Sequence, residues 1–195
     1  MLTFAAAVFL LIITPGPGVL STAGVGAAFG SIAGYRYLVG LCIGTNLVSI
    51  AVITGLAGIM LSTPWLRQVL LGLSTAYLFY LAARIALSGS KISFIEAQKS
   101  PGVVNGIALQ IINPKAYVVN TTLFSGFAFA NYGYIAETGI KLLIMNAVWI
   151  PIHLLWLAAG VMLKRLSLPD RTQRLINLVM AASLIAVVVL ALRGL

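Results

Sequence analysis

Six apolar runs, each long enough to cross a membrane, constrain the fold of this chain more than any other feature. An α-helix needs about 20 apolar residues to cross the hydrocarbon core of a bilayer. We therefore predict an all-α membrane protein with six transmembrane helices, at residues 2–29, 38–61, 66–88, 104–130, 138–163 and 174–193. The helices and their short connections use up the chain, so residues 1–195 are expected to form a single membrane domain.

The composition excludes most soluble functions. Only 8% of the residues are charged and 61% are hydrophobic, whereas a soluble domain has about 25% charged residues. The net charge of +9 does not indicate nucleic-acid binding, because the basic residues lie between apolar runs. A single cysteine, Cys42, cannot form an internal disulfide, and no cluster of Cys and His has the spacing of a metal site. We expect no metal and no cofactor.

The basic residues predict the orientation in the membrane, because cytoplasmic loops carry an excess of Lys and Arg. If the connections alternate between the two sides, eight basic residues share one side: Arg36, Arg84, Lys91, Lys99, Lys164, Arg165, Arg171 and Arg174. Three lie on the other side: Arg67, Lys141 and Arg193. The first side is therefore predicted to be cytoplasmic, with both termini outside.

Two of the six runs contain a helix breaker. The first run is interrupted at Thr14-Pro15-Gly16-Pro17-Gly18 and the fourth at Asn113-Pro114-Lys115. Proline cannot continue the backbone hydrogen-bond ladder, and freed backbone groups inside a membrane are tolerated only when protein buries them or a wet cavity receives them. The breaks predict a binding site near the middle of the membrane. The alternative for the first break is a flexible kink that packs through Gly24, Gly26 and Gly30.

The two breaks fall at corresponding places in the two halves of the chain. Three predicted spans occupy residues 1–88 and three occupy 104–195, so the second half enters the membrane in the opposite sense. Broken helices at matching positions of inverted repeats indicate a transporter site. We therefore predict two inverted three-helix repeats, with helices 1 and 4 interrupted.

Lys115 is the most informative single residue, since it lies well inside the fourth predicted span. Burying an ammonium group in a membrane costs several kcal/mol unless the group is paired or hydrated. All three acidic residues, Glu96, Glu137 and Asp170, fall in loops or at predicted helix ends. The partner of Lys115 is then a carbonyl freed by Pro114, water, or the carboxylate of a ligand. Alternatively, the span starts later and Lys115 reaches the cytoplasmic surface.

Polar residues recur at helical spacing around the breaks and form inward-facing stripes. The candidate substrate-binding residues are Thr14, Pro15, Gly16, Pro17, Gly18, Asn113, Pro114, Lys115, Tyr117 and Asn120. Candidates for the transport pathway or for proton coupling are His153, Asn46 and Asn146. The alternative is that these residues only bond neighbouring helices. In that case His153 would bond a carbonyl freed by Pro151.

Other functions fit less well. An intramembrane serine protease would need a Gly-x-Ser-Gly motif and a histidine, but Leu123 stands where Ser125-Gly126 would require the first glycine. We do not expect an enzyme. An ion-handling or accessory membrane protein of the same architecture is the alternative that stays open.

Several motifs in order resemble the lysine exporter (LysE/RhtB) family of small bacterial transporters. They are Pro15-Gly16-Pro17, Ala76-Tyr77-Leu78 following Pro64-Trp65, and Asn113-Pro114-Lys115-Ala116. The resemblance implies secondary export of neutral or basic amino acids across the inner membrane, driven by the proton motive force. Its partners would be an amino-acid substrate, protons and the lipid bilayer, and a homodimer stays open. The chain departs from the family pattern at Gly18, where Asn is common, and at Ser125-Gly126-Phe127, where Pro-Gln-Phe is frequent.

Overall fold

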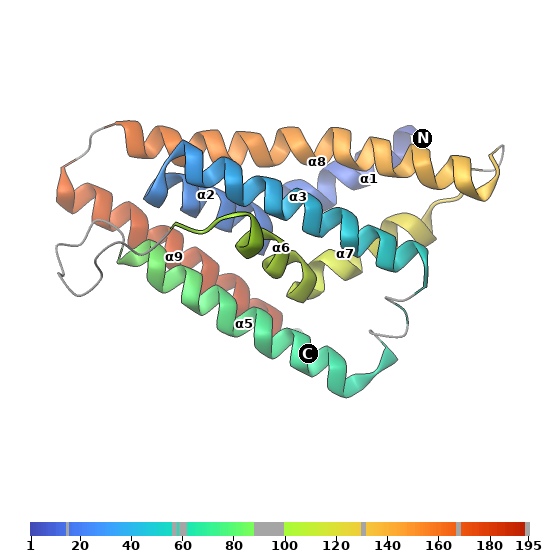
Figure 1. Cartoon of the computed structure of the whole chain (residues 1–195), viewed down its shortest axis with the longest axis horizontal. Helices are drawn as coiled ribbons and strands as arrows, with labels where there is room; N and C mark the ends of the chain where they lie inside the picture. The colour runs from blue at the N-terminus through green and yellow to red at the C-terminus, as the bar shows by residue number, and fades with distance from the viewer. Residues whose placement is uncertain are drawn as a thin grey trace.

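The computed structural model describes residues 1–14, 16–55, 58, 62–87, 100–129, 132–166 and 169–193. Within these residues the chain is helical and forms no strand, which confirms the all-α prediction (Figure 1). The helices are α1 (Leu2–Ile13), α2 (Pro17–Phe29), α3 (Ser31–Ile53), α5 (Pro64–Ala86), α6 (Val103–Ile112), α7 (Pro114–Gly126), α8 (Tyr134–Arg165) and α9 (Asp170–Arg193).

Both predicted interruptions are present. The first predicted span is divided into α1 and α2, which meet at an angle of 52°, and the fourth is divided into α6 and α7 on either side of Asn113. Two short helices followed by two long ones therefore occur twice along the chain. Figure 1 shows that α1 and α2 run in the opposite direction to α6 and α7. This arrangement is what two inverted three-helix repeats predict.

Fewer than six of the described helices are long and apolar enough to span a membrane alone. Three helices, α3, α5 and α8, are long and apolar enough to span a membrane, and α1 with α2 gives a fourth if the bent pair counts as one span. These helices agree with a multi-pass membrane protein. The six spans stay a prediction.

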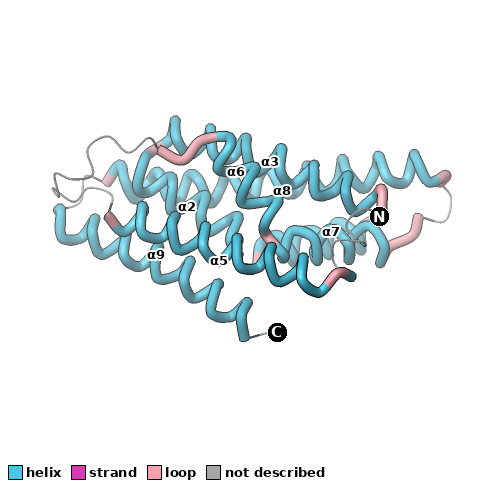
Figure 2. Tube along the Cα trace, turned by 60° about the horizontal axis from the view of Figure 1, so that its bottom comes forward, coloured by secondary structure: helices cyan, strands magenta, loops and turns pink. Residues whose placement is uncertain are grey.

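Glycines let the two halves approach backbone to backbone. A Cβ atom on Gly40 of α3 would overlap the carbonyl group of Val103 at the start of α6. A Cβ atom on Gly160 of α8 would overlap the carbonyl oxygen of Ala23 in α2. Gly44 of α3 likewise lies close to α6, against Ile107 and Gln110. The interrupted span of each half packs against a long helix of the other half: α1 and α2 pack on α8, and α6 and α7 pack on α3. Helix α5 packs against α9 (Figure 2).

Asn46 and Asn146 join α3 to α8 in a reciprocal pair. Each side-chain amide donates to the other's carbonyl oxygen, at 3.0 and 2.9 Å. The surrounding sequences match at a spacing of one hundred residues, Asn46-Leu47-Val48-Ser49-Ile50 with Asn146-Ala147-Val148-Trp149-Ile150. A reciprocal contact between equivalent residues is the contact expected on a two-fold axis. These two predicted pathway residues therefore connect the halves.

Two of the predicted connections are wrong. Arg36 was expected in the first loop, but α3 begins at Ser31 and only Gly30 separates it from α2. Gly30 has φ of +85°, a left-handed conformation that lets the chain reverse in one residue. Glu137 and Lys141 were expected around the fourth connection, but α8 begins at Tyr134 and contains both.

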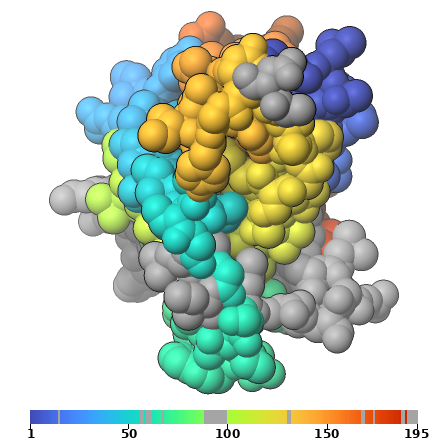
Figure 3. Space-filling view, turned by 90° about the vertical axis from the view of Figure 1, so that its right-hand side faces the viewer, coloured from blue at the N-terminus to red at the C-terminus, as the bar shows by residue number. Residues whose placement is uncertain are grey.

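Lys141 is buried, with only 3% of its surface exposed. Its ammonium group donates to the carbonyl oxygens of Phe124 and Phe127 at the end of α7 and pairs with Glu137. Because these oxygens have no partner within α7, the lysine satisfies the end of that helix. This pairing explains how a charged residue is accommodated inside the bundle. The end of the molecule that contains it, with the end of α7, the start of α8 and the N-terminus, is shown in Figure 3.

Candidate functional site

A cavity of about 60 Å³ lies where the two helix breaks meet. Its walls come from both interrupted spans and from the long helices α3 and α8. The lining residues are Leu11, Ile12, Thr14, Gly16, Pro17, Gly18, Val19, Thr45, Gln110, Asn113, Lys115, Ala116, Val119, Asn120, Met145, Trp149 and His153. This volume is several times the minimum of about 10–15 Å³ that a single water needs, so the cavity can take a small solute.

Lys115 bridges the two breaks. Its Nζ atom donates a hydrogen bond of 2.9 Å to the carbonyl oxygen of Thr14, just beyond the end of α1. A Cβ atom on Gly16 would lie 2.9 Å from Nζ and 3.0 Å from Cδ, so this glycine leaves room for the lysine. The partner of the Lys115 ammonium group is thus a carbonyl oxygen of the first break. The carbonyl oxygens around Pro114, which were predicted as partners, accept hydrogen bonds from other donors.

The carbonyls released by Pro114 are occupied by nearby donors. The hydroxyl of Tyr117 donates to the oxygen of Ile111 at 2.7 Å, and the backbone N–H of Asn113 donates to the oxygen of Gln110 at 3.3 Å. The backbone N–H of Lys115, which would have bonded Ile111, donates to the side-chain oxygen of Asn113 at 3.1 Å. The second break is therefore closed by its own residues, which leaves the lysine ammonium for the first.

The first break is less fully satisfied. Helix α2 begins with Gly16 as its N-cap, and no side chain caps its first amide groups. The N-terminus of a helix carries about half a positive charge and favours anions, whereas the C-terminus, here that of α1, favours cations. The cavity thus has a positive helix end and a negative helix end side by side, with the Lys115 ammonium between them.

Buried polar side chains continue from the breaks into the bundle. Asn113 donates to Gln110 at 3.1 Å, and Gln110 donates in turn to the hydroxyl of Thr45 on α3. The hydroxyl of Ser49 donates to the side-chain oxygen of Asn120 at 2.6 Å. All five side chains are buried, so these bonds hold α6 and α7 against α3 at the level of the cavity.

His153 forms the wall opposite the second break. Its ring stacks on Trp149, with ring centroids 3.6 Å apart, and its Nδ1 lies 3.0 Å from the Trp149 carbonyl oxygen. A carbonyl oxygen only accepts, so Nδ1 carries the proton and Nε2 of the neutral ring keeps its lone pair. A Cβ atom on Gly18 would be 3.3 Å from Nε2. The prediction that His153 bonds the carbonyl freed by Pro151 is wrong, because the carbonyl is that of Trp149.

Most of the predicted binding residues come together at this cavity. Thr14, Gly16, Pro17, Gly18, Asn113, Lys115, Asn120 and His153 all line it. Four others do not line it: Pro114, Tyr117, Asn46 and Asn146. Pro15 lies outside the described residues.

Tyr117 was grouped with Asn113 and Asn120 from helical spacing, yet it points elsewhere. Its ring packs in a separate buried cluster with Val48 and Ala116, while its hydroxyl satisfies the end of α6. Gln110 and Thr45 line the cavity as well, although neither was predicted as a binding residue. Gln110 could have been found, because it lies four residues before Pro114 and carries the one polar side chain in α6 besides Asn105.

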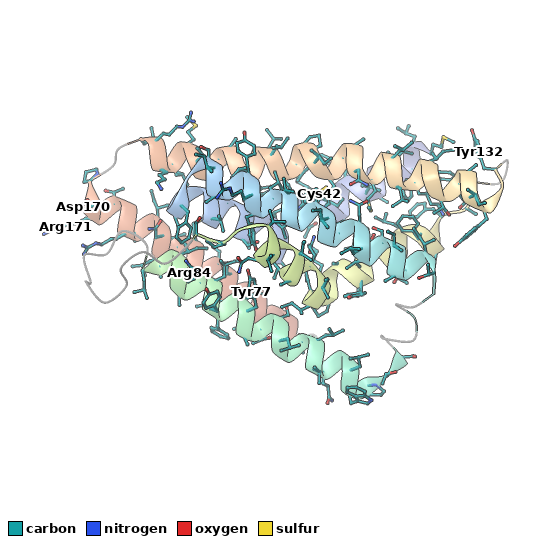
Figure 4. All side chains as sticks on the ribbon, in the orientation of Figure 1. Cys42, Tyr77, Arg84, Tyr132, Asp170 and Arg171 are labelled. Atoms are coloured by element: carbon teal, nitrogen blue, oxygen red, sulfur yellow. The ribbon has the colours of Figure 1, made fainter. Side chains whose placement is uncertain are left out.

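The charge of the cavity is unbalanced. Lys115 is the one charged side chain among the described residues that line it. Of the described acids, Glu137 pairs with Lys141, and Asp170 begins α9 at the far end of the molecule, as Figure 4 shows. A ligand carboxylate is the complement that this site lacks.

A protein-family model, the LysE type translocator, matches residues 9–194 of the chain. The chain belongs to the LysE type translocator family. It is therefore a membrane transporter, and the family places its substrates among amino acids and their derivatives. The resemblance of the sequence motifs to this family is confirmed, and the members of this family are transporters and not enzymes. Comparison with curated proteins and with solved structures found no match.

Proposed function

We propose that this translocator exports amino acids across the bacterial inner membrane, and that it binds the substrate as a zwitterion between the two helix breaks. The single observation that supports this role is the hydrogen bond from Lys115 to the Thr14 carbonyl, which places an ammonium group between opposite helix ends. In this proposal the substrate carboxylate faces Lys115 and the uncapped start of α2. The substrate amino group faces the carbonyl oxygens at the end of α1.

Binding would replace one partner of Lys115 by a better one. A hydrogen bond to a charged acceptor is roughly twice as strong as one to a neutral carbonyl. Once the carboxylate takes the ammonium, the Thr14 carbonyl becomes available to the amino group of the substrate. Substrate entry would thus exchange the bond that holds α1 to α7 for two bonds that pass through the substrate. Because this exchange changes the contact between α1 and α7, substrate binding would move the two broken spans relative to each other.

Transport would follow from rocking of the two halves about the cavity. In the structure, α2 packs closely on α8 and α3 packs closely on α6, through Gly160 and Gly40. In a transporter built of two inverted halves, the other state is reached when the two halves interchange their roles. Close packing of α1 on α8 and of α7 on α3 would then replace the close packing of α2 on α8 and of α6 on α3. The Asn46–Asn146 pair joins equivalent positions, so it can persist in both states. His153, with Nε2 beside Gly18, would be the group through which a proton is coupled.

The test uses purified full-length protein in proteoliposomes loaded with radiolabelled amino acids. We expect release of label above that of protein-free liposomes, faster release when a proton gradient is imposed, and loss of that acceleration with a protonophore. A His153→Gln variant should keep exchange of substrate for substrate and lose the acceleration by the gradient. Release that is identical with and without protein would refute the proposed function. Release that ignores the proton gradient would refute only the coupling.

A further inference from the structure

The charge of the cavity indicates which amino acids it accepts. Lys115 brings one positive charge, and no described residue that lines the cavity brings a negative one. A lysine or arginine substrate would add a second cation within a few ångströms of the first. Like charges at that distance repel strongly in a partly buried site, and the family description alone does not exclude such substrates.

Part of the lining is apolar. Leu11, Val19 and Val119 contribute aliphatic side chains, while Met145 and Trp149 form the wall on α8. No described lining residue besides Lys115 carries a positive charge, so a second carboxylate, as in aspartate or glutamate, would have no cation of its own. The side chain of the substrate is therefore required to be neutral.

We infer that the cavity selects amino acids with neutral side chains and rejects basic and acidic ones. This inference rests on the proposed function, because it assumes that the cavity at the two breaks is the substrate site. Selection then arises from one ammonium group, the absence of a counter-charge among the described lining residues, and the apolar walls.

The experiment compares release of radiolabelled alanine, serine, valine, phenylalanine, glutamate, lysine and arginine from proteoliposomes that contain the wild-type chain. We expect one or more of the four neutral amino acids to leave at least about tenfold faster than lysine, arginine and glutamate. Lysine or arginine leaving as fast as the best neutral amino acid would overturn the inference while supporting amino-acid transport. No release of any amino acid above protein-free liposomes would overturn the proposed function as well.

A substitution in the wall tests the electrostatic cause directly. Val119 on α7 lines the cavity and is only partly buried, so a longer side chain can be accommodated there. Val119→Glu supplies the missing counter-charge, and Val119→Gln has nearly the same shape without it. Lysine release should be at least about tenfold faster with the Glu variant than with the Gln variant. Equal lysine release by two variants that both still release alanine would overturn the inference.

Discussion

Replacing Lys115 by methionine removes the ammonium group and keeps most of the volume of the side chain. In the proposed complex the ammonium pairs with the substrate carboxylate, and truncating one member of a buried, hydrogen-bonded charge pair costs about 2–5 kcal/mol. Lys115 is only half buried, so the lower value of about 2 kcal/mol applies. Since 1.4 kcal/mol is a factor of ten, substrate affinity should fall by about 30-fold.

Lys164 provides the matched control. Its Nζ donates to the carbonyl oxygen of Ala28 in the last turn of α2, at 3.1 Å, so it also meets the end of a helix. It does not line the cavity. Lys164→Met should therefore lose only the interaction with the helix end, about 0.3–1 kcal/mol of stability, and should leave substrate affinity unchanged within about twofold.

The assay is exchange of labelled for unlabelled substrate in proteoliposomes, with half-saturating concentrations measured for wild type and for both variants. Alanine is the first substrate to use. The reasoning predicts a shift of about 30-fold for Lys115→Met only. A Lys115→Met variant with wild-type affinity would refute the role of the ammonium group, and equal losses in both variants would show that the effect is not specific to the cavity.

Three further predictions concern the scaffold. Gly160→Ala should lower the melting temperature in detergent, because a Cβ there overlaps Ala23, with a cost of about 1–3 kcal/mol; Gly139→Ala in the same helix meets nothing within 4 Å and should not lower it. Lys141→Met should lower the melting temperature, because it leaves Glu137 and two carbonyl oxygens without their partner, and an unchanged melting temperature would contradict this role of the lysine. In a double-mutant cycle measured by reversible denaturation in micelles, Asn46→Ala and Asn146→Ala should show a coupling of about 0.6 kcal/mol and at most about 1.7 kcal/mol. Strict additivity of the two changes in stability would mean that the pair does not hold the halves together.

Much of the architecture could be predicted from local sequence. Proline forbids a continuous helix, so the breaks before Pro17 and at Pro114 followed from the residue types alone. The requirement that freed backbone groups be buried or hydrated predicted that the breaks would line a cavity, and they do. The family resemblance rested on the same breaks, and the family match confirms it.

Contacts between distant residues could not be predicted in the same way. Helical spacing placed Tyr117 on one face with Asn113 and Asn120. Its hydroxyl donates instead to the freed carbonyl oxygen of Ile111, and this bond sets the direction of the side chain. Lys141 was predicted near the start of the fifth span, but nothing in its own segment shows that the end of α7 lies beside it. Thr45 and Trp149 come from uninterrupted helices, so only the packing of α3 and α8 across the breaks shows that they face the cavity.

The central claim is that the carboxylate of the substrate binds the Lys115 ammonium between the two breaks. It is tested most directly by a cycle in which the carboxylate is removed from the ligand and the ammonium from the protein. Binding of alanine and of alaninamide, which keeps the amino group and loses the negative charge, is measured by competition against exchange for wild type and for Lys115→Met. We expect wild type to prefer alanine by about tenfold or more and the variant to lose that preference, a coupling of at least about 1.4 kcal/mol. The same preference for alanine in both proteins would show that the carboxylate binds elsewhere and would contradict the account.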